Sequence, residues 1–360
     1  MPFFVSYLMI YLMGGLTAFV ESLRGIKASI GQRLADKGVY VIMAVIVLAF
    51  TIHFVKASGD YVYYHKYMAF INGNRTFNLD NFLYAYELGF SWLAYFVARI
   101  WSGNVHLMVV VITIVPIIFY MLYFKYKSVY PLVSLMIYVA HFHWWLGFVL
   151  IRQMYAVCFL LIALHFLARS KWLSFLLFIG VAALFHSTVL LFLILPLWLK
   201  YKPSFMWQNI LIILMFVVGK MGITGFIGMF LPFLERGTEY ERYLQQATSL
   251  NILSYLEMYV VFLLLSHRRS RIGTLEYRLG LGLSALVLII CGFFINFSLA
   301  SRLAMYFNFY VYLIVFPQWL KSLSVRTRLV SVVVMMIYLF VFLFRFIVVT
   351  VPSYGKAMTW

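Results

Sequence analysis

The chain has 360 residues, of which 65% are hydrophobic and only 11% charged, with a formal net charge of +18 and a mean hydropathy of +0.98. So few polar side chains cannot cover a soluble core, and the apolar runs are continuous rather than alternating, so a soluble domain and a membrane barrel are both excluded. The basic residues stand in short clusters instead of one patch with stacking aromatics, which argues against nucleic acid as a partner. We therefore expect an all-α polytopic membrane protein.

The apolar runs predict the helices in chain order. They cover residues 3–20, 39–55, 88–100, 104–124, 130–148, 149–168, 172–185, 187–199, 205–231, 250–266, 278–297, 299–320 and 329–350. Because about 20 apolar residues span the hydrocarbon core, these runs give about twelve transmembrane or re-entrant helices. The exact number stays open around 88–103, 172–199 and 205–234, where runs are short or interrupted.

The topology follows from the basic residues between these runs. Basic clusters stand in six of these connections: residues 24–37, 125–127, 169–171, 200–202, 267–278 and 321–328. The positive-inside rule places all six in the cytoplasm, with both termini outside. Since no internal repeat or linker is visible, residues 1–360 are expected to form one membrane domain, with an outer interfacial segment at about 57–103 and a second outer loop at about 232–249.

Unusual polar residues gather on the outer side of this predicted topology. The stretch His141–Gln153, HFHWWLGFVLIRQ, places Arg152 in apolar sequence, where a charged side chain is costly unless it lines a site. The other members are Asp60, Glu87, His186, Arg242 and Arg302, while Lys220 belongs either to a cavity or to the outer interface. The alternative interpretation is that the carboxylates are solvated loop charges, that the arginines snorkel and that the tryptophans belong to an interfacial belt.

Neither cysteine nor histidine spacing indicates a metal. Cys158 and Cys291 both lie within apolar runs, and none of the eight histidines falls into a known ligand motif. We therefore expect no metal site and no cofactor.

Several short segments together resemble the EpsG-like branch of the Wzy-type polysaccharide polymerases. They are Gly59-Asp60-Tyr61 with Tyr64 and Tyr67, Tyr86-Glu87-Leu88-Gly89-Phe90, Gly147–Gln153 (GFVLIRQ), Phe185-His186-Ser187, Arg242-Tyr243 and Ser301-Arg302. Their order and spacing carry the resemblance, which covers about residues 60–302. Leu88 stands where that family often has proline.

The resemblance implies an enzyme of the bacterial inner membrane with a GT-C-like glycosyltransferase architecture. Such an enzyme joins oligosaccharide repeat units, carried on undecaprenyl diphosphate, at the outer face of the membrane. Besides this lipid-linked glycan and the membrane lipids, separate flippase and chain-length regulator proteins are expected partners. Its active site would face the periplasm or exterior.

This reaction needs a base for the acceptor hydroxyl and cations for the departing diphosphate. Asp60 is the first expected base and Glu87 the second, with His186 as an alternative base or phosphate ligand. The expected diphosphate ligands are the cations Arg152, Arg302, Arg242 and Lys220. Expected sugar or lipid contacts are Tyr64, Tyr67, His143, Trp144, Trp145, Gln153 and Tyr243.

Other functions fit part of the same pattern. A flippase for the lipid-linked glycan would also use membrane arginines, but its charges should extend through the bilayer depth and inverted repeats are common. Another lipid-linked sugar transferase or ligase, a membrane acyltransferase and a structural scaffold are further alternatives. The scaffold would leave Arg152 unexplained.

Overall fold

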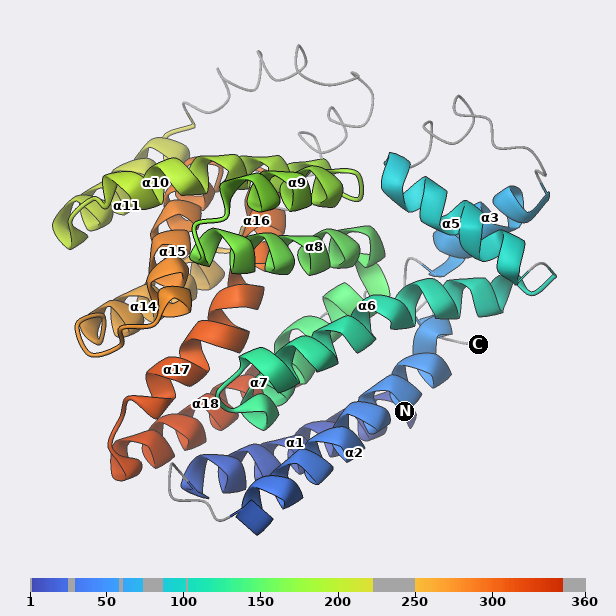
Figure 1. The fold of residues 1–360 in the computed structure, drawn as a ribbon, viewed down its shortest axis with the longest axis horizontal. Coiled ribbons are helices and arrows are strands. Elements are labelled where there is room, and N and C mark those ends of the chain that lie inside the picture. Colours follow the sequence, from blue (N-terminus) through green and yellow to red (C-terminus); the bar gives the residue numbers. More distant parts are fainter. Residues whose placement is uncertain are drawn as a thin grey trace. The chain divides into compact units, whose positions relative to one another are not determined.

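The structure is a computed structural model and describes residues 2–24, 30–57, 61–73, 87–101, 103–222 and 250–345. Throughout this part of the chain the regular elements are helices, and no strand occurs (Figure 1). The all-α prediction is therefore confirmed. Asp60 and the outer loop predicted at about 232–249 lie outside the described residues.

Fifteen α-helices carry labels here, and their bounds follow. They are α1 (Pro2–Arg24), α2 (Ile30–Phe54), α3 (Tyr61–Gly73), α5 (Leu88–Ile100), α6 (Val105–Lys127), α7 (Pro131–Ile137), α8 (Ile151–Ala168), α9 (Trp172–Ala183), α10 (Leu195–Tyr201), α11 (Phe205–Lys220), α14 (Ile252–His267), α15 (Leu275–Phe293), α16 (Ser298–Tyr310), α17 (Phe316–Lys321) and α18 (Val325–Arg345). The 3₁₀ segments are η2 (Val55–Ala57) and η5 (Ser187–Ile194), and the π-helical segments are η3 (Tyr138–Phe142), η4 (Trp145–Val149) and η7 (Val311–Val315).

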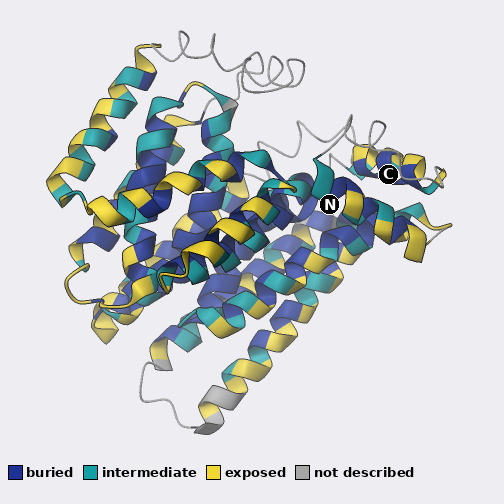
Figure 2. Cartoon of the chain, turned by 45° about the horizontal axis from the view of Figure 1, so that its top comes forward, coloured by how far each residue is buried: buried dark blue, intermediate teal, exposed yellow. Residues whose placement is uncertain are grey.

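Membrane crossing is explained by helix length and apolar character. Among the described residues, seven helical segments are long and apolar enough to span a bilayer, and six shorter apolar helices accompany them. Many residues along the long helices are exposed (Figure 2). Apolar side chains such as Leu16, Val45 and Val341 are among the exposed ones, which suits contact with lipid. The protein is thus a multi-pass membrane protein, whereas the expected number of about twelve spans is not confirmed.

The chain divides into two compact units. The first comprises residues 1–160, 180–187 and 312–360, and the second comprises residues 161–179 and 188–311. In the first unit α1 packs on α2, α7 and α18, while α3 packs on α5 and α6. In the second unit α15 contacts α10, α11, α14 and α16, and the backbones of α11 and α15 approach closely at Gly219 and Gly292.

Charged groups at one end of the first unit complete helix termini. The Glu21 carboxylate accepts the backbone N–H groups of Leu132 and Val133, at 3.0 and 3.2 Å, at the start of α7. The buried Arg328 donates to carbonyls after and at the end of α17, including that of Leu323 at 3.1 Å. Because unpaired terminal groups are costly away from water, these contacts fix the ends of neighbouring helices. Arg328 therefore has a structural role beyond its expected contribution to topology.

A proline interrupts the hydrogen bonding of α6. Pro116 lacks an N–H group, so it cannot donate to the carbonyl of Ile112 one turn earlier. The hydroxyl of Tyr155 on α8 donates to that carbonyl at 2.8 Å and satisfies it. The two helices are thus joined at the proline.

A side-chain hydroxyl also satisfies a carbonyl close to a proline at the start of α17. Pro317 has no N–H group for the carbonyl of Leu313, which lies in the π-helical segment η7. Ser134 of α7 donates its hydroxyl to that carbonyl at 2.6 Å. A neighbouring helix again supplies the donor, as is common for proline inside a membrane.

Candidate active site

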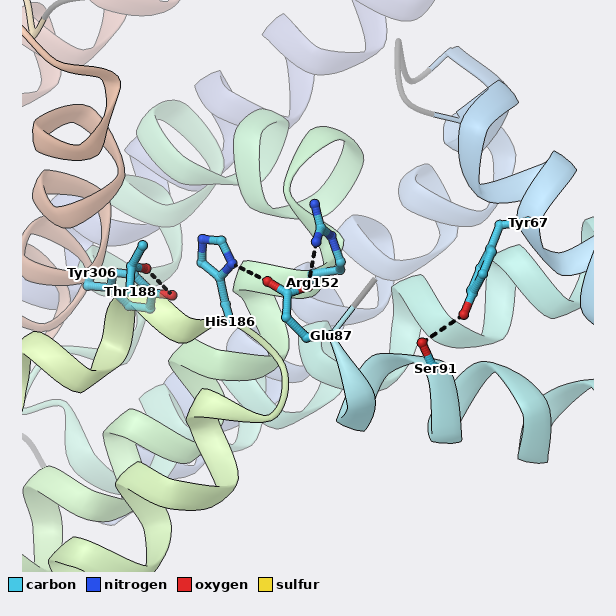
Figure 3. A network of polar contacts seen from close by, with 7 residues as sticks. All are labelled: Tyr67, Glu87, Ser91, Arg152, His186, Thr188 and Tyr306. Carbon is cyan, nitrogen blue, oxygen red and sulfur yellow. Dashed lines mark hydrogen bonds and ion pairs between the residues drawn. The ribbon is translucent and has the colours of Figure 1, made fainter. Parts of the chain in front are cut away.

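Three polar side chains from distant parts of the chain meet in the first unit. Glu87 precedes α5, Arg152 lies in the first turn of α8, and His186 lies in the turn that follows α9 (Figure 3). Arg152 donates from Nη1 to Oε2 of Glu87 in an ion pair, and Nδ1 of His186 lies 2.9 Å from Oε1 of the same carboxylate. We refer to Glu87, Arg152 and His186 as the carboxylate cluster.

Local backbone geometry presents Glu87 to its two partners. The residue is the N-cap of α5, with an extended backbone (φ −61°, ψ 149°), and its side chain makes no capping hydrogen bond. Its carbonyl begins the helix by accepting the N–H of Ser91 at 3.0 Å. The carboxylate is therefore directed to other elements rather than to its own helix.

A change in backbone direction places Arg152. The helical stretch from α7 passes through the π-helical segments η3 and η4 and ends at Leu150, whose backbone is not helical (φ −103°, ψ 50°). The next residue, Ile151, starts α8, so Arg152 stands at a helix beginning. Wide π-helical turns are often found at functional sites, and here two of them precede the arginine.

Helix α3 supports the first turn of α5. The hydroxyl of Tyr67 donates to Oγ of Ser91 at 2.8 Å (Figure 3). The ring of Tyr64 meets Phe90 edge-on with 5.6 Å between ring centroids. Since Phe90 and both tyrosines are buried, α3 holds the helix start that carries Glu87.

Burial and charge act in opposite directions on Glu87. Its side chain is 23% exposed, compared with 20% for Arg152 and 7% for His186. Burial raises the pKa of Glu87, but the hydrogen bond with His186 and the charge of Arg152 outweigh burial and lower the pKa to about 2. The carboxylate is therefore ionised at neutral pH and accepts hydrogen bonds only.

The ionised carboxylate decides the tautomer of His186. Because Glu87 has no proton to give, Nδ1 of the imidazole must be the donor in the 2.9 Å contact. A neutral imidazole held in this way has its basic lone pair on Nε2. The arrangement can accept a proton on the histidine and place a guanidinium beside it.

The remaining charged candidates lie outside the described residues or in the second unit. Asp60, Arg242 and Tyr243 lie outside the described residues. Arg302 is partly exposed on α16, in the second unit. Lys220, also in the second unit, is exposed at the end of α11, with Nζ 3.5 Å from Oδ1 of Asn296.

Most of the expected sugar or lipid contacts are interior residues. His143 is 1% exposed, and its Nε2 lies 2.8 Å from Oγ1 of Thr51. Trp144 is buried edge-on against Phe3, with 5.4 Å between centroids, and Gln153 is also buried. Together with the buried Tyr64 and Tyr67, these residues support the surrounding helices, whereas Trp145 is partly exposed. Direct contact of these residues with a sugar or lipid stays a prediction.

Two interactions, one in each unit, were not expected from the sequence. The N–H of Gly89 donates to the carbonyl of Leu184 at 2.7 Å, which joins the segment after Glu87 to the segment before His186. In the second unit Thr188 and Tyr306 share a hydroxyl hydrogen bond of 3.3 Å (Figure 3). No sequence motif marks Leu184, because its backbone rather than its side chain makes the contact.

In the part of the chain that is described, no group of three histidine, cysteine or acidic residues could hold a metal ion.

No curated protein and no solved structure matches the chain. The model of the EpsG family matches residues 38–358. This match includes every member of the carboxylate cluster and nearly the whole chain, and the chain therefore belongs to the EpsG family, a Wzy-like family of polysaccharide polymerases.

Proposed function

We propose that this protein polymerises oligosaccharide repeat units carried on undecaprenyl diphosphate, at the outer face of the bacterial inner membrane. Family membership supports the polymerase chemistry. The observation that carries the site is the meeting of Glu87, Arg152 and His186. A GT-C-like architecture and separate flippase and chain-length partners belong to the same proposal.

In the proposed reaction, a sugar hydroxyl of the acceptor attacks the anomeric carbon of the donor glycan. The new glycosidic bond forms as the bond between that carbon and the diphosphate oxygen breaks. The hydroxyl proton passes to Nε2 of His186, and undecaprenyl diphosphate leaves as an anion beside Arg152. General-base assistance of this kind contributes roughly 10² to 10⁴-fold to a rate.

In this proposal Glu87 has a different role from the base expected from the sequence. A carboxylate with a pKa of about 2 binds a proton too weakly to act as a good base near neutral pH. Glu87 instead orients the imidazole and stabilises its protonated form. Asp60 stays a prediction as the first base expected from the sequence, and Arg302, Arg242 and Lys220 stay predictions as further diphosphate ligands.

The test is a polymerisation assay with the purified protein in nanodiscs. The substrate is the undecaprenyl-diphosphate repeat unit of the host, EDTA is present, and the products are separated on a gel. We expect a ladder of repeat multiples from the native protein and from Gly180→Ala, a helix substitution with open space around it. His186→Ala should lose the ladder while remaining folded.

Transport is the outcome that would contradict this function. In proteoliposomes a flippase would move the labelled substrate across the bilayer and form no ladder. A ladder of normal rate from folded His186→Ala would instead remove the histidine as base while leaving polymerase activity in place.

A further inference from the structure

The two segments that carry Glu87 and His186 are joined directly through their backbones. Gly89, in the first turn of α5, donates its N–H to the carbonyl of Leu184, just after the end of α9, at 2.7 Å. The first-turn N–H groups and last-turn carbonyls of helices have no partners within their own helices. One hydrogen bond thus satisfies the start of one helix and the end of another.

The contact requires a residue without a side chain at position 89. A Cβ added to Gly89 would lie 2.8 Å from the carbonyl oxygen of Leu184, 2.9 Å from its Cβ and 3.0 Å from its carbonyl carbon. None of these three atoms can move aside by a rotamer change, because two belong to the backbone and the position of the Cβ is set by the backbone. Any other residue would push the two segments apart.

Separation at this point would act on the cluster. Glu87 lies two residues before Gly89, and His186 lies two residues after Leu184. The hydrogen bond between Oε1 and Nδ1 is 2.9 Å long, and hydrogen bonds weaken steeply as the donor and acceptor separate. The backbone contact between Gly89 and Leu184 therefore influences the distance between the Glu87 carboxylate and the His186 imidazole.

We propose that Gly89 is a positioning residue, which holds Glu87 against His186 through its backbone contact with Leu184. Its expected effect on polymerisation rests on the function proposed above, whereas its effect on the environment of His186 does not. Leu184 is 45% exposed as a residue, and its contact with Gly89 is made by its backbone carbonyl.

The first experiment measures the accessibility of His186 without substrate. Purified protein is treated with diethyl pyrocarbonate, which acylates accessible imidazole nitrogens, and labelling of the His186 peptide is followed by mass spectrometry. In Gly89→Ala we expect the labelling rate to rise to that of Glu87→Gln. Gly180→Ala, which adds the same methyl group where nothing lies within 4 Å, should label at the native rate. Native labelling in folded Gly89→Ala would overturn the proposal.

The second experiment measures whether Gly89 acts through Glu87. Polymerisation rates are compared for Gly89→Ala, Glu87→Gln and the double variant across a range of pH. A residue that positions Glu87 should add at most about a twofold further loss once that carboxylate is gone, because contacting residues are strongly non-additive. It should also change the pH profile of the rate. Equal losses in both backgrounds with an unchanged profile would indicate a general structural defect and overturn the positioning role.

Two further variants keep the test informative. Leu184→Ala retains the backbone contact and should label and polymerise as the native protein does. Should Gly89→Ala not be recovered folded, Leu184→Gly loosens the same turn without adding an atom, and it should raise labelling of His186. An unchanged rate of His186 labelling in Leu184→Gly would contradict the positioning role of the backbone contact between residues 89 and 184. If the native protein forms no ladder but labelling of His186 still depends on Gly89, the proposed function is contradicted and the positioning role of Gly89 is not.

Discussion

Glu87 lies between two groups that stabilise its negative charge. The guanidinium of Arg152 and the Nδ1–H of His186 each occupy one oxygen of the carboxylate. Desolvation alone would favour the protonated acid, but the two partners outweigh it. The residue is therefore suited to holding and stabilising a histidine rather than to removing protons itself.

The stability of the protein should depend on pH through Glu87. A carboxylate with a lowered pKa stabilises the fold above its unfolded pKa, and that contribution is lost as the pH falls. For Glu87 the loss should extend from a pH of about 4.5 down to about 2. We expect the native protein to unfold at a higher temperature than Glu87→Gln at pH 7, with the difference shrinking toward pH 3. Thermal unfolding in detergent, followed by tryptophan fluorescence, measures this.

Glu276→Gln, in the first turn of α15, is the matched control, since it makes the same substitution outside the cluster. Its midpoint should follow that of the native protein at each pH. A constant difference between the native protein and Glu87→Gln from pH 7 to pH 3 would contradict the lowered pKa.

Arg152 should not be replaceable by lysine. Arg152→Lys keeps the positive charge but loses the planar fork that can contact the Glu87 carboxylate and a diphosphate oxygen together. We expect roughly a 10²-fold or larger loss of polymerisation rate at the native protein level, in line with the loss of one charge-stabilising donor. The rate of ladder formation checks this, with Lys171→Arg, on an exposed connection, as the control. Near-native turnover by Arg152→Lys would remove the arginine as a diphosphate ligand.

At the level of the helices, side-chain hydroxyls donate to backbone carbonyls that prolines cannot satisfy. Tyr155 satisfies the carbonyl that Pro116 leaves open, and its ring stacks on Phe185 with 5.3 Å between centroids. Because Phe185 immediately precedes His186, the same tyrosine connects the proline region of α6 to the turn of the cluster. Ser134 likewise donates a hydrogen bond to the carbonyl of Leu313, near Pro317.

A double-mutant cycle can measure how much the hydrogen bond from Tyr155 to the carbonyl of Ile112 compensates for Pro116. Tyr155→Phe removes the hydroxyl but keeps the ring, so we expect it to lower the free energy of unfolding by about 1 kcal/mol. In a Pro116→Ala background the new N–H can satisfy the carbonyl of Ile112, so the cost of Tyr155→Phe should fall. Unfolding in detergent gives both costs. An equal cost in the two backgrounds would show that the hydroxyl does not compensate for the proline.

At the scale of the whole molecule, the sequence-based topology places the carboxylate cluster on the outside. Cysteine labelling tests this in intact cells, using Tyr63→Cys on α3 and Lys171→Cys before α9, both at exposed positions. We expect a membrane-impermeant maleimide to label Tyr63→Cys directly and Lys171→Cys only after permeabilisation. The native Cys158 and Cys291 are buried, which keeps the background low. The reverse pattern would place the cluster in the cytoplasm and contradict an outer-face polymerase.

The class of protein and the candidate residues of the cluster could be predicted from the amino-acid sequence. Continuous apolar runs allow only helices in a bilayer, because each helix satisfies its own backbone hydrogen bonds. Charged residues within such runs are costly, so Arg152 stood out without any knowledge of its neighbours. Glu87 and His186 were found through their predicted outer position and their motifs.

The contacts among these residues could not be predicted from the sequence and became visible in the folded chain. The separation of Glu87 from His186 along the chain conceals their contact, and the pKa of the carboxylate depends on that contact rather than on residue type. The same holds for Tyr64, Tyr67 and Trp144, whose amphipathic rings suit either an exposed glycan site or a packed interior. Gly89 belongs to one of the quoted segments, but its sequence context does not show why a glycine is needed there, because that need arises only when the backbone of Leu184 lies against it.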